Sequence, residues 1–194
     1  MTLFNNAACT TPVGGMASDV AAGGTFAIAI SGGPNTVTTI YARATDPAGN
    51  NSGCSTTGFS YSEDSDPPAQ ATFTGTTPVS PSATDSTPTI NGNAEDGATV
   101  FLYETEDCSD VAVQGIATGG TFAITATDAP NTARTFRAEV VDPAGNSSGC
   151  STDKMSYTHD DSAPAAPTGL ATIPVSPSSV SSPTLTGAAE PGAK

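Results

Sequence analysis

The residue types that carry most protein chemistry are few in this chain. It has one histidine, four cysteines and nineteen acidic residues against five basic ones. A lone histidine, His159, cannot build a metal cluster of His and Cys, and the sequence contains no phosphate-binding P-loop. We therefore expect that the protein is not an enzyme and that His159 is exposed to solvent. The remaining chemistry is that of disulfides and of acidic oxygens that bind cations.

The charge of the chain limits its partners. A formal net charge of -14 repels phosphate backbones and anionic bilayers. No apolar run approaches the roughly 20 residues that a membrane-spanning helix requires. We therefore expect no nucleic-acid partner and no membrane insertion.

The chain contains a tandem repeat. The pentapeptide Asp-Pro-Ala-Gly-Asn occupies residues 46–50 and again residues 142–146, an offset of 96 residues. At the same offset, Cys54 returns as Cys150, Gly-Gly-Thr-Phe-Ala at 23–27 returns at 119–123, and Pro-Val-Ser-Pro-Ser at 78–82 returns at 174–178. The period is that of one small domain.

Short strands joined by turns are expected throughout. Thr, Ser, Gly, Pro and Ala dominate the composition, and no segment has the apolar spacing of an amphipathic helix. Alternating residues predict seven strands in the complete copy, over 71–76, 88–94, 99–105, 111–117, 121–126, 132–141 and 154–158. Seven strands at this spacing predict a two-sheet antiparallel sandwich. The repeated pentapeptide is expected to form the turn between the sixth and seventh strands, because Asp bonds turn amides, Pro fixes one φ and Gly permits a positive φ.

Four segments of the complete copy resemble a known family. They are TVFLYETEDC at 99–108, GGTFAITAT at 119–127, AEVVDPAGNSSGC at 138–150 and MSYTHDDSAPAAPTG at 155–169. In their order and spacing they resemble the bacterial Ig-like repeats that are strung in long arrays in surface adhesins and other giant secreted proteins. The resemblance covers nearly the whole chain. It implies immunoglobulin-like sandwiches, an extracellular position and a stalk or adhesive role, and it implies no active site.

The repeat boundaries predict one complete domain and one domain that is split between the chain ends. The complete repeat runs over 67–161, residues 1–66 hold strands three to seven of another repeat, and residues 162–194 hold strands one and two. We expect 162–194 of one subunit to complete 1–66 of a neighbour in a head-to-tail homopolymer. The junction then lies at Met1, Leu3, Leu185 and Lys194. The alternative is a peptide bond at this junction within a longer continuous array.

The repeat symmetry favours one of the three possible cysteine pairings. It joins Cys9 to Cys54 and Cys108 to Cys150, each pair within one copy. Each bridge closes a loop of about 43 to 46 residues and contributes on the order of 3 to 4 kcal/mol. Disulfides form in oxidising compartments, which predicts an extracellular, cell-surface protein. The alternative is free buried thiols in a cytosolic protein.

Acidic residues are expected to converge where the linkers meet the sandwiches, because alternating strand directions place two loops beside the incoming linker. One junction gathers Asp64, Asp66, Glu95, Asp142 and Asn146; the next gathers Asp160, Asp161 and Glu190 with Asp46 and Asn50 of the neighbouring subunit. Carboxylate and amide oxygens are the ligands of calcium, and the resemblance implies linkers that calcium stiffens. The alternative is that these residues form turns and keep solvated charges.

Two functions are compatible with these features. The first is a structural subunit of an extracellular bacterial fibre or stalk, built from head-to-tail Ig-like repeats, whose partner is itself. The alternative is an excised segment of a giant cell-surface adhesin whose modules bind a glycan or protein ligand. Phe101 and Tyr103 are the aromatic candidates for such ligand binding.

Overall fold

The structure is a computed structural model that describes residues 1–13, 19–20 and 22–193. These ranges contain twelve strands and no helix, which confirms the all-β prediction. The strands are β1 (Thr2–Phe4), β2 (Val37–Arg43), β3 (Phe59–Ser62), β4 (Thr72–Thr77), β5 (Thr89–Asn93), β6 (Thr99–Tyr103), β7 (Val111–Ile116), β8 (Thr121–Thr125), β9 (Ala133–Val141), β10 (Met155–Thr158), β11 (Thr168–Ile173) and β12 (Thr184–Ala188). All pairs of these strands are antiparallel.

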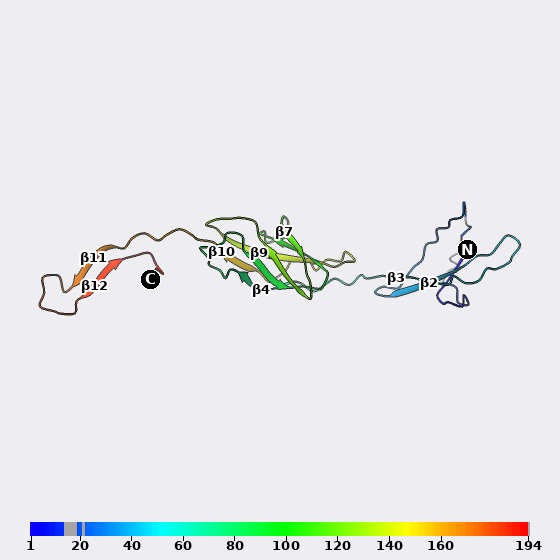
Figure 1. The fold of residues 1–194 in the computed structure, drawn as a ribbon, viewed down its shortest axis with the longest axis horizontal. Coiled ribbons are helices and arrows are strands. Elements are labelled where there is room, and N and C mark those ends of the chain that lie inside the picture. The colour runs from blue at the N-terminus through cyan, green and yellow to red at the C-terminus, as the bar shows by residue number, and fades with distance from the viewer. Residues whose placement is uncertain (14–18, 21, 194) are drawn as a thin grey trace.

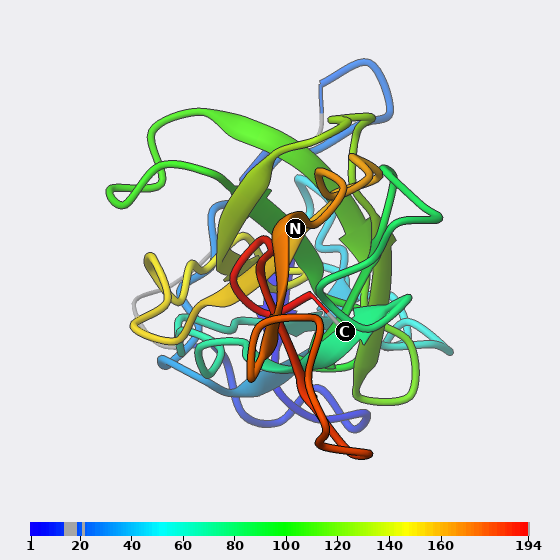
Figure 2. The ribbon, with the colours of Figure 1, turned by 90° about the vertical axis from the view of Figure 1, so that its left-hand side faces the viewer.

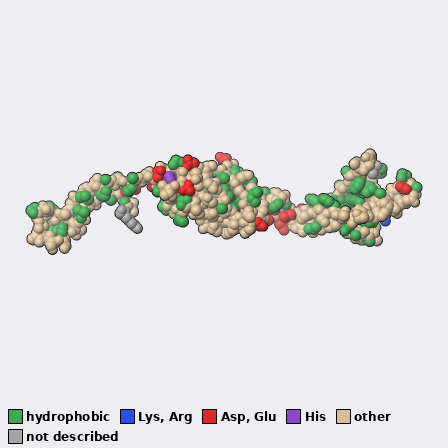
Figure 3. All heavy atoms as spheres, viewed as in Figure 1, with side chains coloured by type: hydrophobic (Ala, Val, Ile, Leu, Met, Phe, Trp, Pro, Cys, Tyr) green, Lys and Arg blue, Asp and Glu red, His purple; other side chains and the backbone are tan. Residues whose placement is uncertain are grey.

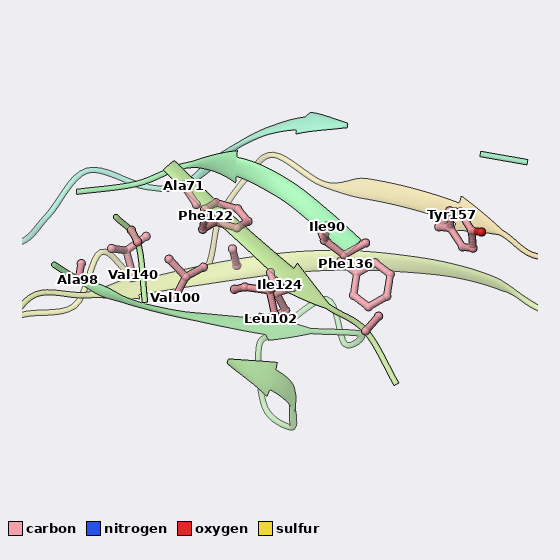
Figure 4. Packing of buried hydrophobic residues seen from close by; sticks show 13 residues of the cluster. Ala71, Ile90, Ala98, Val100, Leu102, Phe122, Ile124, Phe136, Val140 and Tyr157 are labelled. Atoms are coloured by element: carbon pink, nitrogen blue, oxygen red, sulfur yellow. The ribbon is translucent and has the colours of Figure 1, made fainter. Parts of the chain in front are cut away.

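Strands β4 to β10 form a central two-sheet sandwich. One sheet has the order β4-β5-β8 and the other the order β10-β9-β6-β7. Both sheets contribute to one buried apolar cluster, with Ile90 and Phe122 from the first sheet and Leu102 and Phe136 from the second (Figure 4). All seven predicted strands are present, with boundaries within two residues of those predicted.

A close approach in the three-stranded sheet explains one glycine. A Cβ at Gly92 would lie 2.3 Å from Cζ of Phe122 and 2.4 Å from the carbonyl oxygen of Thr72. The absence of a side chain therefore lets the Phe122 ring cross β5 and enter the core, where it meets Phe73 edge to face at 6.1 Å.

The N-terminal sheet repeats three strands of the central sandwich. Its order is β1-β2-β3, and Leu3 pairs with Ala42 just as Leu102 pairs with Ala138 between β6 and β9. The pairing of β2 with β3 likewise follows the register of β9 with β10. The same sequence pattern therefore forms the same half-sandwich in both places.

The C-terminal hairpin of β11 and β12 repeats β4 and β5. Thr172 pairs with Leu185 just as Thr76 pairs with Ile90, and each hairpin has one register shift. This hairpin thus has the register of the first two strands of a sandwich, and no further strand pairs with it among the described residues.

The three parts are arranged along one axis. The N-terminal sheet and the C-terminal hairpin lie on opposite sides of the central sandwich (Figure 1). Viewed along that axis, the parts lie one behind another (Figure 2). Residues 63–71 and 160–167 connect them without regular secondary structure. The described residues contain no helix that could cross a membrane.

Candidate assembly surfaces

The N-terminal part of the chain exposes apolar side chains whose equivalents are buried in the central sandwich. Tyr61 and Phe26 are 47% and 45% exposed, whereas their equivalents in the repeat, Tyr157 and Phe122, are 1% and 3% exposed. Hydrophobic side chains gather on the surface of this part of the molecule (Figure 3). A groove of about 320 Å³ is lined by Leu3, Phe26, Ile28, Ile30, Ile40 and Phe59, among others. In the part of the chain that the structure describes, no second sheet packs on this surface, whereas β4-β5-β8 packs on the equivalent sheet of the central sandwich.

Residues 25–29 repeat the sequence of β8 without forming a strand. Thr-Phe-Ala-Ile at 25–28 recurs at 121–124, and the bridge between Ala22 and Thr25 repeats the bridge between Thr118 and Thr121. In the central sandwich β8 pairs along its length with β5. The equivalent of β5 is β12, near the other end of the chain. Residues 25–29 therefore lack the strand edge that orders β8.

The C-terminal hairpin exposes the complementary surface. Leu185 is 68% exposed, whereas its equivalent Ile90 is completely buried. Among the named strands, β12 pairs with β11 alone, while β5 pairs with both β4 and β8. Val175 and its equivalent Val79 are both exposed, at 80% and 79%. The two repeats therefore differ in exposure at Leu185, a position that the core of the central sandwich buries, and do not differ at Val175, a position that stays exposed in both.

The predicted junction residues are only partly described. Leu3 is 5% exposed on β1, and Met1 precedes that strand with a half-buried side chain. Leu185 lies on β12, at the opposite end of the molecule. Lys194 lies outside the described residues. The structure thus brings Met1 and Leu3 together and keeps Leu185 apart from them within one copy.

The two disulfides pair as the repeat symmetry predicts. Cys9 is bonded to Cys54 and Cys108 to Cys150, and no described cysteine is free. Each bond lies within the N-terminal sheet region or within the central sandwich. Two disulfides indicate a non-reducing environment of the kind found outside the cell.

The two Asp-Pro-Ala-Gly-Asn segments form the same turn. Asp142 Oδ1 accepts hydrogen bonds from the amides of Gly145 and Asn146 at 2.7 and 2.9 Å, and its Oδ2 accepts one from Asn146 Nδ2 at 2.8 Å. Asp46 and Asn50 repeat the side-chain bond at 2.9 Å. These bonds, foremost that from the asparagine side chain, hold the pKa of both Asp142 and Asp46 below the usual value. The turn prediction is confirmed.

The acidic residues predicted to bind calcium lie near the two linkers, and acidic side chains gather there (Figure 3). Asp64 and Asp160 each accept a hydrogen bond from the backbone amide two residues later in the chain, at 3.1 and 3.0 Å. Asp66 accepts a hydrogen bond from the side-chain amide of Asn35. Asp161, Glu95 and Glu190 are exposed. Among the described residues no group of three or more His, Cys, Asp or Glu is placed to hold a metal ion. Calcium binding remains a prediction, which a melting temperature unchanged by a chelator would refute.

The prediction that His159 is exposed is wrong. The side chain is 5% exposed, and its Nδ1 accepts a hydrogen bond from the amide of Asn131 at 3.0 Å. The equivalent bond in the N-terminal repeat runs from the amide of Asn35 to Glu63 Oε2 at 2.6 Å. Both asparagines have a left-handed φ, 52° and 54°. This position therefore requires an acceptor rather than imidazole chemistry, and the repeated Pro-Asn-Thr at 34–36 and 130–132 is the sequence signal for it.

The two aromatic candidates for ligand binding are engaged in the fold. Tyr103 is 5% exposed, and its hydroxyl donates a hydrogen bond to Glu139 Oε2 at 2.7 Å. Burial, together with this bond, raises the pKa of Tyr103 to about 12. Phe101 is half-buried on the same strand. Neither side chain offers a fully exposed aromatic face on which a sugar ring could stack.

Comparison of the chain with known protein families and with curated protein sequences finds no match.

Proposed function

We propose that this chain is the structural subunit of an extracellular bacterial fibre or stalk, which assembles head to tail by completing Ig-like sandwiches between copies. One observation carries the proposal: two separate surfaces of the chain correspond to two parts of the central sandwich. These parts are the β4-β5 hairpin and the strands from β6 to β10. The N-terminal sheet, with residues 25–29, has the register and apolar face of one part. The C-terminal hairpin has the register and apolar face of the other.

The partner of each surface is a second copy. The two surfaces lie at opposite ends of the central sandwich (Figure 1), and side-chain amides hold the linkers that leave it. A contact between different surfaces of identical copies leaves one free surface at each end of the assembly. Such a contact therefore propagates into an open, linear polymer.

The driving force is the one that stabilises the central sandwich. Burying one large apolar side chain contributes about 1.5 to 3 kcal/mol, and Leu185, Phe26 and Tyr61 would all change from exposed to buried. Pairing of β12 with residues 25–29 would add the main-chain hydrogen bonds that join β5 to β8. The high negative charge favours solubility of the resulting polymer.

Sedimentation and electron microscopy of the purified chain test this proposal. The expected result is filaments in native buffer that dissolve into a 19.0 kDa species on a denaturing gel. A monomer at all accessible concentrations would refute the proposal. Species that remain very large under denaturing, reducing conditions would instead indicate peptide-bonded junctions.

A further inference from the structure

The linker between the N-terminal sheet and the central sandwich is held from both sides. On the N-terminal side, Asn35 Oδ1 accepts a hydrogen bond from the amide of Ser65 at 2.8 Å, and Asn35 Nδ2 donates to Asp66 Oδ1 at 2.8 Å. On the side of the central sandwich, Asn146 Nδ2 donates to the carbonyl oxygen of Asp64 at 3.1 Å. This two-sided set of hydrogen bonds, here named the linker clamp, restrains the rotation of one unit against the next.

The second linker repeats one bond of the N-terminal side of this clamp, and Ser162 stands there in place of Asp66. Asn131, the equivalent of Asn35, accepts a hydrogen bond through Oδ1 from the amide of Asp161 at 2.9 Å. Within the described part of the chain, the carbonyl oxygen of Asp160 accepts no hydrogen bond. Asp160 is the equivalent of Asp64, whose carbonyl is held by the sandwich that follows it. Within the described residues, β11 and β12 are the strands that follow Asp160.

The donor that would complete the second clamp is present at the opposite end of the chain. Asn50 is the equivalent of Asn146 and makes the same turn, donating from Nδ2 to Asp46 Oδ2 at 2.9 Å. A side-chain amide has two hydrogens. Asn146 uses them for Asp142 and Asp64. Asn50 uses one for Asp46, and the described residues provide no acceptor for the other.

We infer that Asn50 of the copy that accepts the hairpin donates this hydrogen bond to the Asp160 carbonyl of the copy that supplies it. The inference rests on the proposed head-to-tail assembly, and it assigns the contact that sets the orientation of successive copies. Because an equivalent asparagine then holds residues 63–71 and residues 160–167 from the sandwich that follows each linker, we expect both linkers to have the same bend and rotation. The polymer accordingly repeats with every sandwich, twice per chain.

Three variants of the full chain test the inference. Asn50→Ala removes the donor at the junction between copies, and Asn146→Ala removes it at the covalent linker. Asp46→Ser is the matched control, because it removes the Asn50–Asp46 side-chain bond, keeps an oxygen for the turn amides and leaves the Asn50 amide in place. Bend angles between successive sandwiches are measured in micrographs, and junction affinity is measured by sedimentation over a dilution series.

The expected outcome is specific for each linker. Asn50→Ala broadens the bend angles at every second linker and weakens the junction by about two- to tenfold, the net effect of one hydrogen bond. Asn146→Ala broadens the other set of linkers and leaves junction affinity unchanged, and Asp46→Ser resembles wild type. Two results would overturn the inference and leave the proposed function standing. In the first, the wild-type chain forms filaments and Asn50→Ala has the same bend angles and junction affinity. In the second, Asp46→Ser changes both quantities as much as Asn50→Ala does. A wild-type chain that forms no filaments would overturn the proposed function itself.

Discussion

Truncation of Leu185 separates assembly from folding. This side chain is 68% exposed on β12, whereas its equivalent in the central sandwich, Ile90, is completely buried. Removing a large aliphatic side chain from a core costs about 2 to 5 kcal/mol. In Leu185→Ala that cost falls on the junction between copies, because only assembly would bury the side chain. The expected result is a junction association constant lower by about 30- to 4,000-fold, at 1.4 kcal/mol per factor of ten.

The assay compares three variants by sedimentation velocity and thermal unfolding. Leu185→Ala should abolish or shorten filaments and leave the melting temperature of the central sandwich unchanged. Ile90→Ala should lower that melting temperature. Val175→Ala is the control on the hairpin, because Val175 and its equivalent Val79 are both exposed, and it should assemble as wild type does. If Leu185→Ala assembles as tightly as Val175→Ala, the hairpin does not fill a core position of another copy and the reasoning fails.

Three further predictions concern stability. Reduction of both disulfides should lower the free energy of unfolding by roughly 3 to 4 kcal/mol per bond, measured by denaturant titration with and without reductant; an unchanged midpoint would contradict it. The pKa of Tyr103 is raised to about 12 in the folded protein, whereas in the unfolded chain it is about 10. Its contribution to the free energy of unfolding is therefore present below about pH 10 and is lost as the pH rises toward 12. Tyr103→Phe should flatten this alkaline loss of stability, and an equal slope in both proteins would refute the assignment of the loss to the buried Tyr103 hydroxyl. Gly92→Ala should destabilise the central sandwich by about 1 to 3 kcal/mol, because the new Cβ would overlap both the Phe122 ring and the Thr72 carbonyl oxygen; a wild-type melting temperature would contradict this overlap.

The sequence predicts the central sandwich well because its signals are local and repeated. Alternating apolar residues predict the strands, and Phe122, Phe136 and Tyr157, which lie on three of them, are all buried in the core. The disulfide pairing follows from symmetry between the copies, without knowledge of the fold. These features depend on neighbours in sequence or on the repeat itself, which one sequence reveals.

The linker contacts are harder to predict because they depend on the backbone conformation of single residues. Asn131 and Asn35 adopt a left-handed conformation, and their amides meet acceptors as different as His159 and Glu63. The difference in residue type hides the common role, so His159 is mistaken for a surface residue. The same limit applies to Asn146, whose reach to the preceding linker becomes visible only when the turn and the linker are placed together.

Hydrogen exchange at residues 25–29 and 184–188 reports directly whether β12 of one copy completes the sandwich of another. The amides of residues 25–29, and those of β12 that do not pair with β11, should exchange quickly in the dilute chain and slowly after assembly, because residues 25–29 would then pair with β12 as β8 pairs with β5. Amides of Thr121–Thr125 serve as the internal reference for a completed pair. Rapid exchange of residues 25–29 in filaments that are otherwise well formed would contradict the account.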